Sequence, residues 1–83
     1  MKYDDKLREQ IKDMTLILLY LNSFEDCGSL RSWKGYDFDD LNNLAEEGLI
    51  SEGRRAKSIV LYDDGIEKAR ALRAEYRVHL PER

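Results

Sequence analysis

The stretch from Phe38 to Leu61 constrains the fold of this chain most, because a helical apolar pattern passes in it directly into a strand pattern. Asp37 precedes the helical part as a natural N-cap, and Gly48 follows it as a residue that readily takes the left-handed conformation at a helix end. The residues at helical spacing that we expect to be buried are Phe38, Leu41, Leu44 and Ala45. The sequence therefore predicts a middle helix that packs through one face.

Two short apolar runs follow this helix. They cover residues 49–51 and 58–61, and they flank a six-residue loop that contains Gly53. β-branched residues in the second run favour an extended chain, and two such runs around a glycine-containing loop are typical of a hairpin. We therefore expect a two-stranded β wing with a basic loop at its tip.

A long amphipathic helix is predicted at the amino terminus, from Asp4 or Asp5 to about Asn22. Apolar residues recur in it at alternating steps of four and three, at Leu7, Ile11, Met14, Leu18 and Leu21. Its second half carries further apolar residues outside this stripe, namely Leu16, Ile17, Leu19 and Tyr20. A helix that is apolar on most sides is buried on more than one side, either under other elements or against a second subunit.

The remaining segments are a break in the pattern and a last helix. Residues 25–29 are turn-like, and residues 30–33 predict either a short strand or a single helical turn. We expect Trp33 and Tyr36 to pack on the middle helix, with contact to a partner as the alternative. The last helix begins after Leu61 and is expected to end at Pro81, with its inward positions at Ile66, Ala69, Leu72 and Tyr76.

The size and composition of the chain limit its class. Its 83 residues form one domain, 1–83, which buries only roughly 60% of the unfolded surface, so a second subunit would add useful core. Cys27, the single cysteine, has no internal disulfide partner, which fits a reducing compartment. The first residues show no secretory signal, and the apolar run 16–21 is too short to cross a membrane. We therefore expect a cytoplasmic protein without membrane contact.

Two resemblances follow from these motifs. The pattern Leu44-x-x-x-Gly48-Leu49-Ile50, with a basic loop, a β-arm and Leu61-x-x-x-Gly65, resembles the carboxyl-terminal half of the multiple-antibiotic-resistance and phenolic-acid regulators, two bacterial winged-helix families. In those families a Thr at the position of Tyr62 caps the following helix, so here capping is expected to pass to Asp63 or Asp64. The whole chain, including Arg31-x-Trp33-Lys34-Gly35-Tyr36-Asp37, is similar to a family of short bacterial proteins with no assigned function.

The first resemblance implies an α+β, winged-helix-like fold. Its parts are a long N-terminal helix, a middle helix, a two-stranded β wing and a long C-terminal helix. A helix-turn-helix also needs a second helix that braces the one in the groove. Only a dozen residues, interrupted by Gly28 and Gly35, separate Phe24 from Asp37. The bracing helix is therefore expected to be short or absent.

Charge argues against DNA reading by the middle helix. The face that we expect to be exposed offers Asp39, Asp40, Asn42, Asn43, Glu46 and Glu47 and no cation, whereas binding to duplex rests on Lys and Arg that neutralise phosphates. The cations lie elsewhere, at Arg54, Arg55 and Lys57 in the loop and at Arg31 and Lys34 before the helix. Such a patch suits phosphates or an acidic partner, and it also discourages edge pairing of the hairpin.

The chain offers little for catalysis. His79 lies near the carboxyl end, and no second cysteine or nearby histidine gives Cys27 the spacing of a metal site. We expect no catalytic residue, cofactor or metal. The leading hypothesis is a non-enzymatic protein-interaction module that forms a homodimer through Ile11, Leu18, Leu19 and Tyr76 and binds a further protein partner. The alternative is a DNA-binding transcriptional regulator that contacts duplex through its basic wing.

Overall fold

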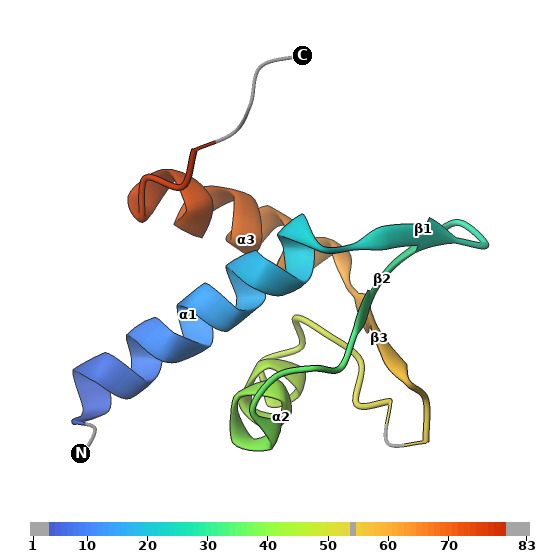
Figure 1. Ribbon diagram of the computed structural model, residues 1–83, viewed down its shortest axis with the longest axis horizontal. Helices are drawn as coiled ribbons and strands as arrows, with labels where there is room; N and C mark the ends of the chain where they lie inside the picture. Colours follow the sequence, from blue (N-terminus) through green and yellow to red (C-terminus); the bar gives the residue numbers. More distant parts are fainter. Residues whose placement is uncertain (1–3, 54, 80–83) are drawn as a thin grey trace.

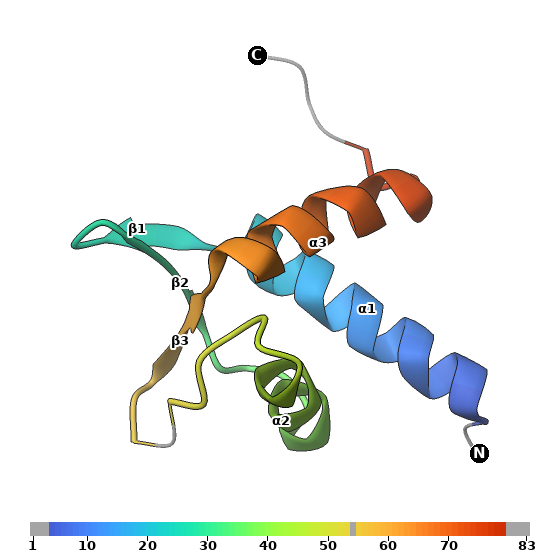
Figure 2. The same ribbon diagram turned by 180° about the vertical axis from the view of Figure 1, so that it is seen from behind.

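The computed structural model describes residues 4–53 and 55–79. The elements are α1 (Asp5–Leu21), β1 (Phe24–Asp26), β2 (Ser29–Trp33), α2 (Phe38–Glu46), β3 (Ser58–Leu61) and α3 (Asp63–Glu75). The predicted α+β class with long first and last helices is thus confirmed. α1 lies between the other two helices and contacts both, while the strands run past its carboxyl end (Figures 1 and 2).

The amino-terminal helix α1 has the predicted bounds but turns a different face inward. The Asp4 carboxylate caps it by accepting a hydrogen bond from the Leu7 backbone N–H at 2.7 Å, and Asn22 is its C-cap. The buried residues are Lys12, Thr15, Leu16, Ile17 and Leu19. The apolar stripe that the sequence shows at steps of four and three, which includes Met14, Leu18 and Leu21, faces outward instead. α2 and α3 both pack on the side of Leu16, so the second apolar set forms the core.

A β-hairpin occupies the segment in which the sequence left a strand or a helical turn open. β1 and β2 are antiparallel, and Asp26 pairs with Ser29 around a two-residue turn. Both turn residues, Cys27 and Gly28, have positive φ (51° and 80°), as a type I′ turn requires. Residues 22–37, all of them described, contain no helix, so nothing helical braces α2 from this side.

The sheet has the order β1-β2-β3 and is antiparallel throughout. The predicted wing, in which residues 49–51 pair with 58–61, was wrong about the main partner of β3. β3 pairs along its length with β2, and residues 49–51 join its other edge through a bridge between Ile50 and Leu61. Backbone hydrogen bonds from Ser51 N–H to the Val60 carbonyl oxygen and from Tyr62 N–H to the Leu49 carbonyl oxygen flank this bridge. Residues 49–51 follow directly on a helix end and are few, whereas the five-residue β2 offers β3 a full partner.

α2 begins and ends as the sequence predicts. The Asp37 carboxylate accepts hydrogen bonds from the backbone N–H groups of Asp39 and Asp40, and Gly48 stands at φ 76° in the position that closes the helix. Burial differs at two places. Phe38 is 67% exposed, and Asp40 is buried with 4% exposed. Phe38 opens the helix at its rim, where the core does not reach it.

α3 departs from prediction at both ends. Its N-cap is Tyr62 without a side-chain hydrogen bond, so the expected capping by Asp63 or Asp64 was wrong. The helix ends at Glu75, not at Pro81, which lies outside the described residues. Arg77 takes a left-handed conformation at φ 56°, and the next backbone N–H bonds back to the Arg73 carbonyl oxygen at 2.9 Å, which terminates the helix as a glycine would.

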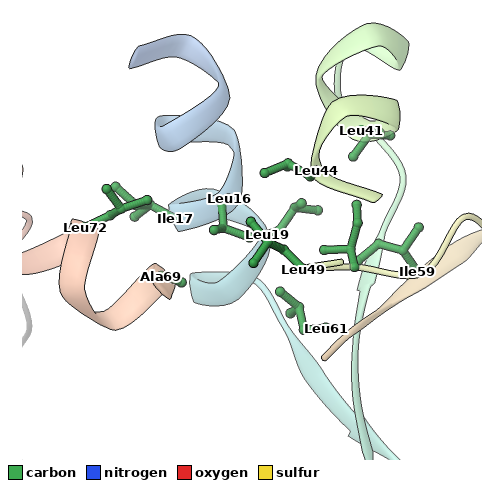
Figure 3. Packing of buried hydrophobic residues seen from close by; sticks show 11 residues of the cluster. Leu16, Ile17, Leu19, Leu41, Leu44, Leu49, Ile59, Leu61, Ala69 and Leu72 are labelled. Atoms are coloured by element: carbon green, nitrogen blue, oxygen red, sulfur yellow. The ribbon is translucent and has the colours of Figure 1, made fainter. Parts of the chain in front are cut away.

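The core lies where the three helices meet the sheet (Figure 3). Ile17 of α1 and Leu72 of α3 face each other, and Leu16 and Leu19 point toward α2 and the sheet. The chain from α2 into α3 supplies the other members, which are Leu41, Leu44, Leu49, Ile50, Ile59, Leu61 and Ala69. All three helices are thus fixed against one small cluster.

Candidate interaction surfaces

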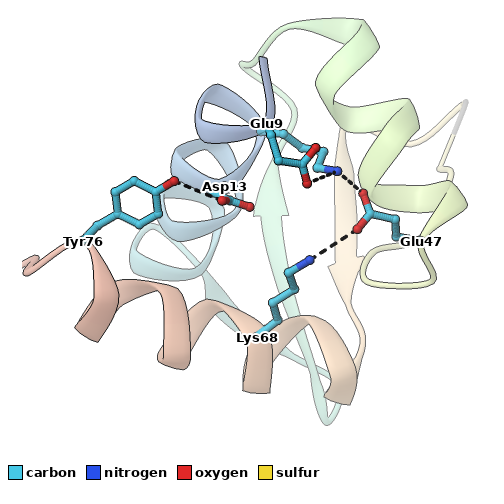
Figure 4. Close-up of polar contacts among 6 residues, drawn as sticks. Glu9, Asp13, Glu47, Lys68 and Tyr76 are labelled. Atoms are coloured by element: carbon cyan, nitrogen blue, oxygen red, sulfur yellow. Dashed lines mark hydrogen bonds and ion pairs between the residues drawn. The ribbon is translucent and has the colours of Figure 1, made fainter. Parts of the chain in front are cut away.

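Glu47, the C-cap of α2, ties the three helices together by charge (Figure 4). Its carboxylate pairs with Lys12 of α1 and, at 3.3 Å, with Lys68 of α3, and Lys12 also pairs with Glu9 at 2.9 Å. Burial by itself raises the pKa of Glu47, but the hydrogen bonds from Lys12 and Lys68 outweigh it and lower that pKa. Burial likewise lowers the pKa of Lys12, and its two carboxylate partners raise it more. This junction is structural.

The exposed face of α2 is less acidic than the sequence predicts. Asp40 is buried, and desolvation together with the nearby Asp37 charge raises its pKa. Glu47 is held in the junction. Of the four carboxylates expected on this face, Asp39 and Glu46 remain there beside the exposed amides of Asn42 and Asn43. The face still carries no cation.

The predicted dimer residues divide between the inside and the outside of the chain. Leu19 is fully buried in the core, so it drops out of the predicted interface. Tyr76 is half-buried and its hydroxyl donates to the Asp13 carboxylate at 3.0 Å (Figure 4), while burial and this bond raise its pKa. Leu18 is 46% exposed and Ile11 is half-buried on the same side of α1.

The outer face of α1 is defined here as the five apolar residues that the sequence places at steps of four and three. They are Leu7, Ile11, Met14, Leu18 and Leu21. Met14, Leu18 and Leu21 are 40–46% exposed and lie on the side of the helix away from Leu16. Met14 and Leu21 were missing from the predicted interface, although the periodicity that contains them was visible in the sequence.

The structure brings cations from two segments that are distant in sequence together at the start of β3, near Ser58. Arg31 donates from Nε to the Ser58 hydroxyl at 2.8 Å and from a terminal nitrogen to the Ser58 carbonyl oxygen at 3.2 Å. Lys34 donates from Nζ to the Gly53 carbonyl oxygen at 2.6 Å, and its backbone N–H donates to the Lys57 carbonyl oxygen.

We call the resulting cluster the basic wing patch; its members are Arg31, Lys34, Arg55 and Lys57. Arg55 and Lys57 are exposed in the loop before β3. Arg54, which the sequence adds to this group, lies outside the described residues.

An exposed aromatic pair lies next to this patch. Trp33 is 60% exposed, and its ring lies 5.0 Å from that of Phe24 between ring centroids. It does not pack on α2 as expected, because the strand pairing directs it to the face of the sheet opposite the core. Tyr36 is half-buried, and its hydroxyl accepts a hydrogen bond from the Asn22 amide at 3.3 Å. Nothing in the sequence singled out Phe24.

Described residues line two grooves on the surface. The larger, about 820 Å³, lies between the hairpin and α3 and mixes Arg70 and Arg73 with Glu25 and Asp63. The smaller, about 490 Å³, lies beside α2. Within residues 4–53 and 55–79, no three His, Cys, Asp or Glu side chains gather as metal ligands would. No helix in that part of the chain has both the length and the apolar character to cross a membrane.

The chain is similar to proteins without an assigned role. Residues 7–79 match the family described as "Domain of unknown function (DUF6429)". An uncharacterized protein, y4hR of Sinorhizobium fredii (strain NBRC 101917 / NGR234), is 36% identical over 66 residues, which cover 77% of this chain and 84% of that protein. No solved structure matches the chain. The resemblance to a family of short bacterial proteins is thereby confirmed, while the resemblance to the regulators stays a prediction.

Proposed function

The chain belongs to the family described as a domain of unknown function (DUF6429), so its role has to be inferred from its own surfaces, and we propose that it is a non-enzymatic protein-interaction module that dimerises through the outer face of α1. The single observation that carries this proposal is the exposure of Met14, Leu18 and Leu21 on the side of α1 away from the core. The occupant we propose is a second copy of the chain.

The spacing on the outer face of α1 supports a helical partner. Steps of four and three are the spacing at which two helices pack side by side along a seam. Residues 14–22 carry no charge at all, so a second copy would bring no like charge against this half of the helix. A two-fold dimer requires such a self-complementary patch.

The energetics agree with a modest affinity. Completing the burial of a half-exposed Leu or Met contributes about 1 kcal/mol, half of what full burial of such a side chain supplies. Two copies of the three exposed residues contribute on the order of 6 kcal/mol before Leu7 and Ile11 are counted. This gain is of the same order as the entropic cost of association, so a dissociation constant in the micromolar range requires the other contacts of the interface, Leu7 and Ile11 included, to add several kcal/mol.

A charge inserted into the outer face tests this proposal. Leu18→Glu places a carboxylate against its own copy, so light scattering at about 100 µM is expected to give a dimer for the wild type and a monomer for the variant. Ala71→Glu is the matched control, because Ala71 is exposed on α3 and lies off this face. Circular dichroism checks that both variants fold. A dimer that survives Leu18→Glu would refute the interface.

The second candidate is a DNA-associated regulator that contacts duplex through its wing, on a reduced winged-helix frame. Support comes from the order α2, arm 49–51, loop and β3, with the hairpin β1-β2 standing where a bracing helix would be. The specific observation in its favour is the gathering of Arg31 and Lys34 with Lys57 in the basic wing patch.

Salt dependence tests this second candidate. Duplex binding that rests on phosphate contacts weakens steeply with salt, and Lys57→Ala is expected to weaken it equally for all sequences and to lower the salt slope by about one. A gel-shift series at low salt with duplexes of unrelated sequence makes the measurement. No shift at low salt, with the chain shown to be folded, would exclude it.

A further inference from the structure

We propose that the exposed face of the hairpin, together with the basic wing patch, binds single-stranded nucleic acid. The residues of this face are Phe24, Arg31 and Trp33, and we call them the aromatic platform. The proposal does not rest on the dimer, which uses a different element, and it differs from wing-mediated duplex binding in its ligand and in its residues.

Strand geometry places the three side chains of the platform on one face. Phe24 of β1 pairs directly with Arg31 of β2, and Trp33 follows Arg31 by two residues, so all three share a side of the sheet. The 5.0 Å separation of the Phe24 and Trp33 rings agrees with this register. The opposite side of the sheet carries Ile59 and Leu61 into the core.

The exposed ring surface suits an unpaired base. Trp33 is 60% exposed although it rests on Phe24, so much of its ring surface faces solvent. A base that stacks on such a ring contributes about 1–3 kcal/mol without regard to its identity. Bases inside a duplex already stack on each other and present no free face. The platform therefore favours single strands.

The cations of the basic wing patch keep their charge available. Arg31 and Lys34 donate to a hydroxyl and to carbonyl oxygens, which are neutral acceptors that fix the side chains without cancelling their charge. Among the described residues, every ion pair has Lys12 or Lys68 as its cation. The carboxylates nearest in sequence to Arg31 and Lys34 are Asp26 at the hairpin turn and Asp37 at the start of α2. Glu46 and Glu52 line the groove beside α2 together with Lys34. A strand stacked on Trp33 would thus meet Arg31 on the same face, and it would reach Lys34 and Lys57 only around the edge where β2 meets the start of β3.

The tryptophan itself supplies the assay, since Trp33 is the only one in the chain. Titration of the wild-type protein with an oligothymidylate of about 12 nucleotides at low salt is expected to quench its fluorescence, as base stacking on the indole does. Added salt should reverse the quenching. Duplex of the same length and an oligoglutamate peptide serve as comparison ligands.

Two pairs of variants separate stacking from charge, with a labelled oligothymidylate and anisotropy as readout. Trp33→Ala is expected to weaken binding about 5- to 150-fold, the equivalent of one lost stacking contact. Phe38→Ala, which removes another exposed aromatic, should leave it within about twofold. Lys57→Glu should weaken it and Lys6→Glu, the same charge change on α1, should not.

The following results would overturn the proposal. Unchanged Trp33 fluorescence at low salt, or equal weakening by Trp33→Ala and Phe38→Ala, would show that no base stacks on the platform. Tighter binding of duplex would assign the patch to double-stranded DNA. Tighter binding of oligoglutamate would assign it to an acidic protein segment. Leu18→Glu, which is expected to abolish the dimer, should still bind the strand.

Discussion

The ammonium of Lys12 and the carboxylate of Glu47 form an ion pair that joins α1 to the end of α2, with the Lys12 side chain only 10% exposed. The burial of Lys12 is tolerated because its ammonium pairs with the carboxylates of Glu9 and Glu47. The same carboxylate reaches Lys68 of α3, so one residue links all three helices. The junction therefore determines how the helices sit around the core.

Glu47→Gln is expected to lower the free energy of unfolding by about 1–3 kcal/mol, since it leaves Lys12 partly buried beside a neutral amide. Chemical denaturation at neutral pH measures the loss. Glu46→Gln is the matched control, because Glu46 is exposed one position earlier, and it should change stability by less than about 0.5 kcal/mol. Equal effects of the two variants would contradict the role given to the junction.

The same junction predicts how stability depends on pH. The pKa of Glu47 in the folded chain lies below its ordinary value of 4.5, so its contribution is present above pH 4.5 and is lost as the pH falls through the folded value. The pKa of Lys12 is raised above 10.5, so its contribution is present below that pH and is lost as the pH rises through the folded value.

Denaturation of the wild type and of Glu47→Gln from neutral to acid pH makes this measurement. The stability difference between them should narrow below about pH 4.5. Asp40 acts in the opposite direction, because its raised pKa makes the ionised form costly at neutral pH, and it is present in both proteins. A constant difference across this range would show that the charge of Glu47 does not matter.

Gly65→Ala is expected to destabilise the chain by about 3 kcal/mol or more, or to prevent folding. A Cβ at this position would lie 2.1 Å from the carbonyl oxygen of Leu49, so α3 would have to move off the core. Gly35→Ala serves as control, since a Cβ there meets nothing within 4 Å. Thermal denaturation of both variants decides the matter, and equal melting temperatures would contradict the close approach.

Cys27→Asn is expected to stabilise the chain by about 0.5–1 kcal/mol. Cys27 holds φ at 51° in the hairpin turn, a conformation that costs most side chains about 1–2 kcal/mol and that Asn tolerates better. Urea denaturation of the reduced proteins measures the gain. A loss of stability would mean that the turn is not of the type described, because the Cys27 thiol is exposed and makes no hydrogen bond to the described residues.

Local signals in the sequence were sufficient for the bounds of α1 and α2 but not for those of α3 or for the sheet. Asp4, Asp37 and Gly48 cap or close helices as predicted, because their side-chain and backbone chemistry acts within a few residues. The partner of β3 is decided by which strand completes the core, and this depends on contacts between segments far apart in the sequence. The sequence therefore predicted the pairing of residues 49–51 with 58–61, which the structure keeps as a bridge, but it missed β2 as the third strand.

The sequence also contained the outer face of α1 without showing which way it points. Both apolar sets of the helix were visible, but only the positions of α2 and α3 decide that Leu16 and Leu19 are buried while Met14 and Leu18 are exposed. For the basic wing patch, the loop cations were evident, whereas the hydrogen bonds that bring Arg31 and Lys34 to them depend on the β2-β3 register.

Sedimentation equilibrium of the wild-type chain, from about 1 to 200 µM, tests the central claim most directly. If the outer face of α1 is covered by a second copy, the apparent mass should rise with concentration from 9.8 kDa toward twice that value. A mass that stays at 9.8 kDa over the whole range would contradict dimerisation through α1 and leave Met14, Leu18 and Leu21 for a different partner.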